Sequence, residues 1–591
     1  MIAAPKSGRS SRFRRLLHYL RPHQTKIWAG VIALLVVNLL GTYLPLLIGT
    51  AIDELQDQFQ FQRVVFYALL LIGLASLMWL IRMASRLWLF GAGRLVEFDL
   101  KQRIFEHLLR LEPSYFAENT AGDLINRATS DVDNIRRLVG FALLSAVNTL
   151  FAYGFTLPVM LAIHPGLSLG AIAVYPAVLF IVQSFSDRLR AEQLEVQQSL
   201  SDLSDLIQED MSGIALIKIY GQEANEQRQF DRLNSELLVN NLVLAKTRNI
   251  LFPLLGGMVS FSLLILLWFG SRMIADNTIQ VGDFVALLLY IERLIFPTAL
   301  LGFTITTYQR GEVSIDRVEA ILSVEPRIQD APDAVALPRQ QVKGHLRFQD
   351  LSYTYPNRRR PVLDRLTFEI QPGEMVAIVG PIGCGKSTLA SALPRLLEID
   401  PNQIFLDGID ITRLRLADLR GAIAYVPQES FLFSTTIKNN IRYGEPEASD
   451  LKVIAAASQA QIHHEILNFP KQYETLVGER GITLSGGQRQ RTALARALLV
   501  DAPILVLDDA LASVDNQTAS QILRALHDHR QTVLFISHQL AAAATCDRIL
   551  VMDQGRIVQQ GSHSELVAVG GLYQSLWEQY QVEATLQSEG N

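Results

Sequence analysis

Cysteine is almost absent from this chain of 591 residues, which contains only Cys384 and Cys546. Two cysteines so far apart in sequence exclude a disulfide framework and a cysteine-rich zinc site, and both are expected at small buried positions. Net charge is also small, at −5. Because there is no strong basic excess, nothing in the overall charge indicates binding to nucleic acid.

Charged residues are also missing from long stretches of the first half. Ile27–Ile52, Val64–Ile81, Leu138–Ser186 and Asn249–Ser271 contain no Asp, Glu, Lys or Arg, and Val281–Tyr308 contains only three such residues. A membrane-spanning helix needs about 20 mostly apolar residues. The long third run is interrupted by the turn sequence HPG, so we expect two helices there and six spans in all. Buried core helices of a large soluble protein are the alternative, which the length of the runs disfavours.

Lys and Arg residues predict how the spans are oriented. The first 25 residues are strongly basic, whereas Asp53–Arg63, after the first run, is mainly acidic. The positive-inside rule therefore places the N-terminus in the cytoplasm, and six crossings return the second half to the same side. The start lacks the cleavage site of a signal peptide. Short outer segments and no organellar presequence favour a bacterial inner membrane.

The segments expected on the inner side, Arg82–Arg137 and Asp187–Arg248, are long and highly charged. Apolar residues recur in them at helical spacing, so we expect them to continue the spanning helices into the cytoplasm. Two interruptions, Glu112–Leu124 and Ser212–Glu223, are typical of turns between such extensions.

The second half contains a glycine-rich motif for phosphate binding. The stretch MVAIVGPIGCGKSTLASAL predicts a buried strand, a G-x-x-x-x-G-K-S loop and the start of a helix. Its glycines let backbone N–H groups surround phosphates, Lys386 reaches the outer phosphates, and Ser387 can bind Mg²⁺. The predicted nucleotide-binding residues of this loop are Gly380, Pro381, Ile382, Gly383, Cys384, Gly385, Lys386, Ser387 and Thr388.

A second short apolar run, Ile504–Leu507, leads directly into two carboxylates, Asp508 and Asp509. Such a run predicts a buried parallel strand whose carboxyl end opens into a site. In P-loop NTPases an acid at this position helps to hold Mg²⁺. We therefore expect Asp508 to hold Mg²⁺ and Asp509 to polarise the attacking water; a strand-end cap is the alternative for Asp509.

Between these two motifs lies LSGGQ, Leu484–Gln488, a glycine-rich turn before a basic helix. By itself it is either a second phosphate contact or a cap of that helix. Its place between the phosphate loop and the acid-tipped strand resembles the signature of ATP-binding cassette (ABC) proteins. With six spans and long inner segments, nearly the whole chain resembles a half-transporter of the ABC exporter type.

This resemblance implies an all-α six-span transmembrane domain of the ABC exporter type and an α/β P-loop NTPase cassette, with ATP and Mg²⁺ as cofactors. The expected division is a cytoplasmic N-terminal segment (1–25), a transmembrane domain (26–312), a linker (313–343), an ABC nucleotide-binding domain (344–580) and a polar tail (581–591).

Further residues match the family one by one. Tyr355 matches the aromatic that stacks on adenine, and Gln428 the residue that links Mg²⁺ and the attacking water to the membrane domain. His538 matches the switch histidine that contacts the terminal phosphate. Asp515 lies in the SVD loop that communicates across the dimer, and Val477–Gly481 matches the segment that touches the inner turns.

In this family two cassettes close head to tail over two ATPs, each held between one chain's phosphate loop and the other chain's LSGGQ. The resemblance therefore implies a second half-transporter as partner. The signature residues that would face the partner's nucleotide are Ser485, Gly486, Gly487 and Gln488.

Asp509 departs from the family, which usually has glutamate there. Aspartate is one methylene shorter, and a water-positioning carboxylate must come within ~2.6–3.2 Å of its target. We therefore expect ATP binding with slow hydrolysis. Since LSGGQ is complete, the chain resembles one subunit of a heterodimeric exporter with one degenerate site. One alternative is a homodimer with two slow sites. The other is that local surroundings compensate for the shorter aspartate and the site keeps full activity.

The predicted function is ATP-driven export of a hydrophobic or amphiphilic substrate (drug, lipid or peptide) by alternating access. One alternative is an importer or ATP-gated channel on the same scaffold. Another is a soluble-type ABC ATPase acting on nucleic acid or ribosomes, which the six spans disfavour. Glu292 and Arg293, in the last apolar run, either meet the substrate or hold the helices together.

Overall fold

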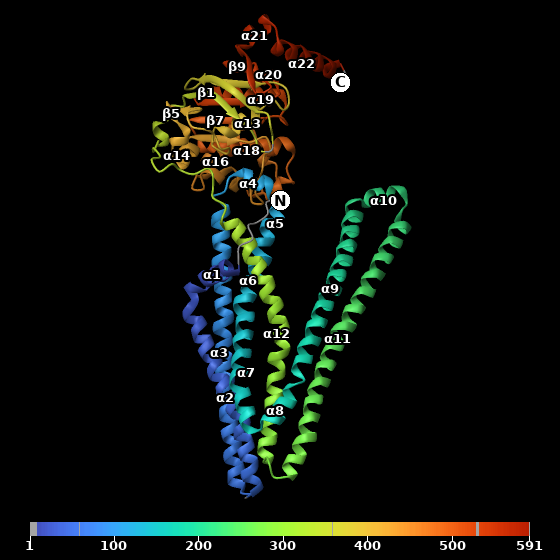
Figure 1. Ribbon diagram of the computed structural model, residues 1–591. Coiled ribbons are helices and arrows are strands. Elements are labelled where there is room, and N and C mark those ends of the chain that lie inside the picture. Colours follow the sequence, from blue (N-terminus) through green and yellow to red (C-terminus); the bar gives the residue numbers. More distant parts are fainter. Residues whose placement is uncertain (1–8, 58, 357, 528–530, 590–591) are drawn as a thin grey trace. The chain divides into compact units, whose positions relative to one another are not determined.

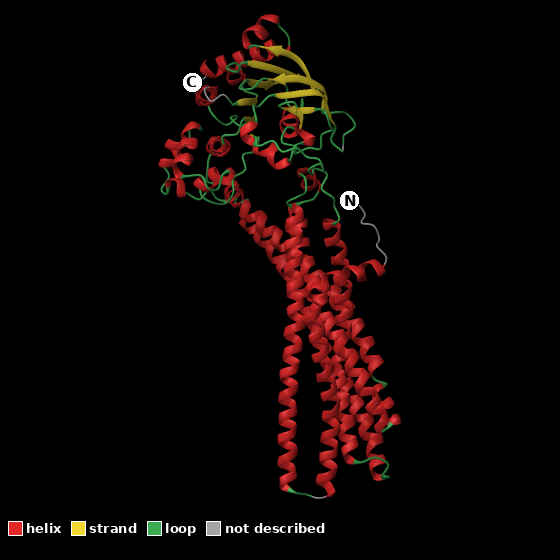
Figure 2. Cartoon of the chain, turned by 90° about the vertical axis from the view of Figure 1, so that its left-hand side faces the viewer, coloured by secondary structure: helices red, strands yellow, loops and turns green. Residues whose placement is uncertain are grey.

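The structure is a computed structural model that describes residues 9–57, 59–356, 358–527 and 531–589. Residues 1–8 of the expected N-terminal segment and 590–591 of the expected tail lie outside the described residues. The chain forms two compact units, one of Met1–Arg110 and Asn119–Val324 and the other of Leu111–Glu118 and Glu325–Asn591. Figure 2 shows that the strands belong to the second unit.

Within the described residues the first unit, here called the spanning unit, is built of helices alone. Five helical stretches are long and apolar enough to cross a membrane: Leu16–Asp57, Phe61–Leu108, Ala121–Ile163, Pro165–Ser212 and Val281–Leu322. A shorter apolar helical stretch, Ser260–Ala275, lies in the remaining expected run. A helix satisfies its own backbone polar groups, which lipid cannot do. The prediction of a helical transmembrane domain is confirmed.

Figure 1 labels the helices of the spanning unit. Their bounds are α1 (Arg9–Leu20), α2 (Gln24–Asp57), α3 (Phe61–Leu108), α5 (Ala121–Asn126), α6 (Val132–Arg137), α7 (Leu143–Ile163), α8 (Pro165–Ile172), α9 (Tyr175–Ser212), α10 (Ile214–Tyr220), α11 (Glu223–Ala275) and α12 (Val281–Leu322). Two π-helical turns, Arg127–Asp131 and Leu138–Ala142, flank α6.

The expected break at the HPG turn is present. Helix α7 ends at Ile163, and His164 adopts an extended backbone conformation. The Nδ1 atom of His164 accepts a hydrogen bond from the Leu167 N–H at 3.2 Å, so His164 caps α8. Pro165 fits the first helical position because its missing N–H would have no partner there.

Arg293 is bound to α2. Its guanidinium donates to the Asn38 carbonyl oxygen at 2.8 Å and to Thr42 Oγ1 at 3.1 Å. Gly41 leaves the room for this contact, since a Cβ there would lie 2.9 Å from Arg293 Nη2. These bonds favour the interpretation that Arg293 holds helices together, whereas the neighbouring Glu292 is exposed.

Both expected inner turns are present. Helices α9 and α11 pack side by side and are joined through α10 (Figure 1). The apolar side chains of Leu216, Ile219 and Tyr220 on α10 are 60%, 74% and 71% exposed. The other expected turn is Glu112–Leu124. Its first part, up to Glu118, belongs to the second unit, where Glu112 Oε2 accepts a hydrogen bond from the Arg327 N–H at 3.3 Å.

The second unit, here called the cassette, contains two sheets. The four-stranded antiparallel sheet has the order β2-β1-β4-β5, and the six-stranded sheet has the order β10-β9-β3-β8-β7-β6. In the larger sheet β9, β3, β8, β7 and β6 are parallel neighbours. Strands β3, β7 and β8 are completely buried, as expected where both faces of a parallel sheet are covered. The predicted α/β architecture is confirmed.

The strands of the cassette are β1 (Leu346–Tyr353), β2 (Leu363–Ile370), β3 (Met375–Val379), β4 (Ile404–Leu406), β5 (Ile409–Asp410), β6 (Ile423–Val426), β7 (Ile504–Asp508), β8 (Thr532–Ile536), β9 (Arg548–Asp553) and β10 (Arg556–Gly561). Its helices are α4 (Pro113–Glu118), α13 (Lys386–Ala392), α14 (Leu416–Gly421), α15 (Ile437–Ile441), α16 (Asp450–Gln459), α17 (His463–Leu467), α18 (Gly486–Val500), α19 (Asn516–His527), α20 (Leu540–Ala543), α21 (His563–Val569) and α22 (Leu572–Glu589).

Candidate functional site

The carboxyl ends of four parallel strands meet at one edge of the six-stranded sheet. The glycine-rich loop follows β3, His538 lies shortly after β8, Asp509 follows β7, and Gln428 lies shortly after β6. Because β8 lies between β3 and β7, the phosphate loop and the two aspartates are two strands apart. Four sequence motifs thus meet at the edge where ligands bind in open α/β sheets.

The phosphate loop needs its glycines because other backbone segments approach closely. Gly380 has a φ of 151°, and a Cβ there would lie 2.0 Å from the Met552 carbonyl oxygen. Gly385 has a φ of 106°, and a Cβ there would lie 2.7 Å from the Val362 carbonyl oxygen. The loop surrounds the Lys386 ammonium group, whose Nζ donates to the carbonyl oxygens of Gly380 at 2.8 Å and Pro381 at 2.9 Å.

Asp508 is buried and receives two hydrogen bonds. Ser387 Oγ donates to Asp508 Oδ1 at 2.9 Å, and the Tyr425 hydroxyl donates to Asp508 Oδ2 at 3.3 Å. Burial raises the pKa of Asp508 above its usual range, although these two donors oppose the shift. A carboxylate and a hydroxyl oxygen side by side are hard donors of the kind that Mg²⁺ prefers.

Asp509 is only 9% exposed and has an unusual backbone conformation. Its φ is 49°, and its N–H donates to the Ile536 carbonyl oxygen of β8 at 2.8 Å. Among the described residues, Asp509 Oδ1 is buried and has no hydrogen-bond partner. Buried polar atoms in native structures are normally paired, so this oxygen is a candidate contact for a bound group.

His538 lies near Lys386 and both aspartates. Partial burial lowers the pKa of His538, the charge of Lys386 lowers it further, and the carboxylates of Asp509 and Asp508 act in the opposite direction. The lowered pKa favours a neutral imidazole at pH 7. Gln428 is exposed.

Tyr355 lies beside the first turn of α13, at the end of the phosphate loop. Its hydroxyl shares a hydrogen bond with Thr388 Oγ1 at 3.2 Å. Its ring packs edge-on against Tyr353, with the ring centroids 5.0 Å apart. The aromatic is therefore placed next to the loop that the sequence predicts to bind phosphates.

The LSGGQ turn begins α18 and packs against the loop that follows β7. Ser485 caps α18 in a capping box with Gln488. A Cβ at Gly487 would lie 2.8 Å from the Ser513 carbonyl oxygen, so only glycine permits this approach. The Ser513 N–H in turn donates to Gln490 Oε1 at 2.7 Å. The signature turn and the SVD loop therefore form one packed element.

Asp515, the last residue of the SVD loop, has a local contact. Its Oδ1 accepts a hydrogen bond from the Thr518 N–H at 2.9 Å, and this bond lowers the pKa of Asp515. Among the described residues, no hydrogen bond or ion pair joins the LSGGQ turn to the phosphate loop.

The sequence interpretation did not include three polar residues that shape this region. Tyr425 binds Asp508, Gln490 holds the SVD loop, and Gln539 Nε2 donates to the carbonyl oxygens of Leu511 and Val514 at 3.2 Å each. A signal exists only for Tyr425, a polar aromatic at the end of a short apolar strand. The two glutamines are ordinary surface-type residues in sequence.

Comparisons with known proteins agree with this architecture. The family described as "ABC transporter transmembrane region" matches residues 27–298, and the family described as "ABC transporter" matches residues 363–512. The "Probable multidrug resistance ABC transporter ATP-binding/permease protein YheI" of Bacillus subtilis is 32% identical over 573 residues, which are 96% of this chain and 97% of that protein. The chain belongs to the ABC transporter family.

Two further relatives of the transporter support the same conclusion. An "ATP-dependent lipid A-core flippase" of Aromatoleum aromaticum is 35% identical over 481 residues, which are 81% of the transporter and 79% of the flippase. A solved structure of a bacterial Atm1-family ABC exporter with ATP bound superposes with a TM-score of 0.76 at 26% identity, covering 95% of the transporter and 99% of that chain. The predicted exporter fold and an ATPase that drives transport are confirmed.

Proposed function

We propose that this transporter exports a hydrophobic or amphiphilic substrate (a drug, a lipid or a peptide) by alternating access. We place it in a bacterial inner membrane with both termini in the cytoplasm, as the basic start and acidic first outer segment favour. Relatives named a multidrug resistance transporter and a lipid A-core flippase support this class of cargo. Transport into inverted vesicles tests the direction, and uptake in the opposite sense would instead support an importer.

Within the cassette, the proposed nucleotide site follows from the phosphate loop. Backbone N–H groups of the glycine-rich loop and Lys386 bind the ATP phosphates, and Tyr355 stacks on adenine. Ser387, Asp508 and Gln428 hold Mg²⁺, which when bound neutralises phosphate charge. The 2.9 Å contact between Ser387 Oγ and Asp508 Oδ1 supports this assignment, because it brings two suitable oxygen ligands together.

We also propose that the working unit is a pair of half-transporters, with LSGGQ of one chain facing the nucleotide of the other. Two observations support a pair. Within one chain, among the described residues, no hydrogen bond or ion pair joins LSGGQ to the phosphate loop. The apolar residues Leu216, Ile219 and Tyr220 of α10 are largely exposed. Exposed apolar side chains grouped in this way are typical of contact surfaces, and the partner's cassette would cover them.

Asp509 carries the proposal of a slow site in a heterodimer. In this proposal Asp509 takes the role of the attacking-water residue. It lies next to Asp508 at the end of β7, and its Oδ1 is buried and unpaired among the described residues. The shorter side chain retracts this carboxylate from the water by about one bond length, and chemistry of this kind is sensitive to ~1 Å displacements. His538 and Gln428 then complete a site that binds ATP but hydrolyses it slowly, while Asp515 takes part in communication with the second site.

The decisive experiment compares ATP hydrolysis by the purified chain in lipid nanodiscs with hydrolysis by Asp509→Glu, with the oligomeric mass recorded. Asp508→Asn is the control that abolishes activity in either background. Near-zero activity that rises strongly in Asp509→Glu supports a slow site and a natural partner with a complete acid. Robust turnover by an unmodified homodimer, unchanged by the substitution, would make the transporter a symmetric exporter instead.

A further inference from the structure

A polar cavity of about 560 Å³ lies in the spanning unit, where α3, α6 and α12 meet. Its walls include Glu97 and Lys101 from α3, Asp133 and Arg137 from α6, and Arg310 from α12. The π-helical turn Arg127–Asp131 forms another part of the wall. Such turns occur frequently at functional sites, because they alter the direction of side chains in a helix.

The cavity lies where two of its three helices leave the apolar zone. Arg137 immediately precedes the charge-free run that begins at Leu138, and Arg310 follows Tyr308, the end of another apolar run. On α3 the charge-free run ends earlier, at Ile81, so Glu97 and Lys101 lie in the charged extension of this helix. Because the apolar runs next to α6 and in α12 both end at the cavity, the cavity is expected close to the inner membrane surface, where lipid headgroups lie.

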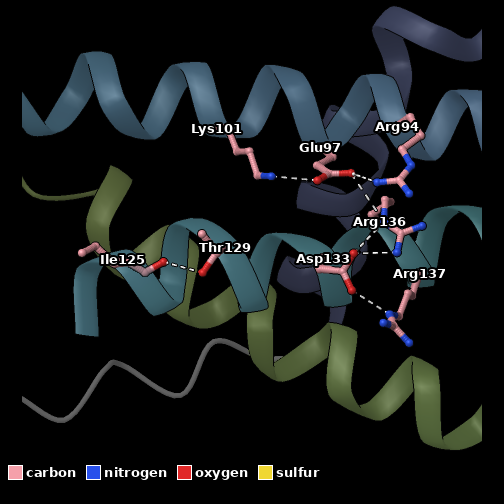
Figure 3. Close-up of polar contacts among 8 residues, drawn as sticks. All are labelled: Arg94, Glu97, Lys101, Ile125, Thr129, Asp133, Arg136 and Arg137. Carbon is pink, nitrogen blue, oxygen red and sulfur yellow. Dashed lines mark hydrogen bonds and ion pairs between the residues drawn. The ribbon is translucent and has the colours of Figure 1, made fainter. Parts of the chain in front are cut away.

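The two carboxylates of the cavity are already neutralised. Figure 3 shows Glu97 between Arg94, Lys101 and Arg136, at 2.9, 2.8 and 3.5 Å. Asp133 is paired with Arg136 at 2.6 Å and with Arg137 at 2.7 Å (Figure 3). Four cationic side chains thus pair with only two carboxylates, even without Arg310.

Arg310 adds a further positive charge. It is exposed, and it forms no hydrogen bond or ion pair within the part of the chain that the structure describes. The cations around the cavity therefore outnumber its carboxylates, and one of them is free to bind. An electropositive polar cavity attracts an anion, and guanidinium and ammonium groups are the usual partners of phosphate.

We propose that this cavity binds the phosphate of an anionic lipid headgroup from the inner leaflet. Lys101, Arg137 and Arg310 come from three helices, so a bound phosphate links α3, α6 and α12. The volume is in the range of sites for small ligands, and the depth at the membrane surface favours a lipid over a soluble anion. Recognition of this headgroup requires neither ATP hydrolysis nor the proposed partner chain, so it is tested separately from the transport function.

The test measures lipid binding to the full-length transporter. The protein is reconstituted in phosphatidylcholine nanodiscs with increasing fractions of phosphatidic acid, and the retained phosphatidic acid is counted by native mass spectrometry. Loss of one cation near a membrane surface weakens anionic lipid binding about fivefold. We expect that loss in Arg310→Gln, whereas Arg310→Lys, which keeps the charge, retains most of the affinity. Both variants are expected to fold, because Arg310 makes no bond to other described residues.

Arg248→Gln is the matched control. Arg248 is also exposed and also borders a charge-free run, but it does not line this cavity. Equal weakening by Arg248→Gln and Arg310→Gln would overturn the site in favour of general surface attraction. Inorganic phosphate is added as the soluble anion; if it raises the melting temperature as much as phosphatidic acid does, the lipid assignment is overturned. A melting-temperature increase from phosphatidic acid that Arg310→Gln reduces, with little effect of inorganic phosphate, supports the proposal.

Discussion

Tyr425 and Ser387 bind opposite oxygens of the same carboxylate. The Tyr425 hydroxyl donates to Asp508 Oδ2 at 3.3 Å, and Ser387 Oγ donates to Asp508 Oδ1 at 2.9 Å. Tyr425 belongs to β6, two residues before the loop that carries Gln428, and Asp508 ends the neighbouring strand β7. The tyrosine therefore fixes the orientation of the proposed Mg²⁺ ligand from the strand that leads to Gln428.

We expect Tyr425→Phe to weaken the Mg²⁺ dependence of ATP hydrolysis without unfolding the cassette. The substitution keeps the ring and removes one hydrogen bond, which contributes about 0.5–1.5 kcal/mol. The apparent affinity for Mg²⁺ should fall several-fold, while saturating Mg²⁺ restores most of the rate. The measurement is a Mg²⁺ titration of ATPase activity in the Asp509→Glu background. An unchanged titration curve would show that Tyr425 does not position Asp508.

Gly487 should be the less replaceable of the two signature glycines. A Cβ at Gly487 would lie 2.8 Å from the Ser513 carbonyl oxygen, a backbone atom that cannot rotate away. A Cβ at Gly486 would meet only Ser513 side-chain atoms, at 3.4 and 3.5 Å. Forcing an extra methyl group into packed backbone costs about 1–3 kcal/mol. Gly487→Ala should therefore lower the melting temperature, and Gly486→Ala should leave it nearly unchanged; similar values for the two would contradict this packing.

Local motifs of the cassette could be predicted because each depends on residues close in sequence. The spacing of Gly380, Gly385 and Lys386 determines a strand, loop and helix whose geometry hardly varies. The capping box of Ser485 and Gln488 is likewise a contact within one turn. The unusual aspartate at position 509 could also be recognised from the sequence, because the neighbouring Asp508 defines its place in the motif.

Contacts between elements that are far apart in sequence could not be predicted in the same way. Arg293 binds Asn38, 255 residues earlier, and Tyr425 binds Asp508, 83 residues later. Helical periodicity indicates which residues share a face but not which neighbouring helix that face meets. The ion pair between Glu97 of α3 and Arg136 of α6 depends on such packing, so the sequence showed that the inner segments are highly charged but not which charges pair.

Arg293 and Glu292 form a natural pair of variants because their surroundings differ. Arg293 donates three hydrogen bonds to α2, whereas Glu292 is exposed. Hydrogen bonds between helices in a membrane contribute on average about 0.6 kcal/mol each. Arg293→Met should therefore lower the stability of the spanning unit by about 2 kcal/mol, and Glu292→Gln should leave it unchanged. Steric trapping or thermal unfolding in nanodiscs measures the stability of both variants. A larger loss of stability in Glu292→Gln than in Arg293→Met would show that the structural role does not belong to Arg293.

The pH dependence of alkylation at Cys546 tests whether this thiol is buried in the folded cassette. Cys546 is 7% exposed, and burial raises its pKa to about 12. Because thiolate is the reactive form, this shift lowers its fraction at pH 8 about a thousandfold relative to an ordinary thiol. In a Cys384→Ser variant, which leaves Cys546 as the single thiol, alkylation should be very slow at pH 8 and should accelerate with rising pH without reaching a plateau by pH 10. Unfolding in denaturant should restore the ordinary rate, which serves as the control. Rapid labelling of the native cassette at pH 8 would mean that Cys546 is not enclosed between α20 and β9 as the fold requires.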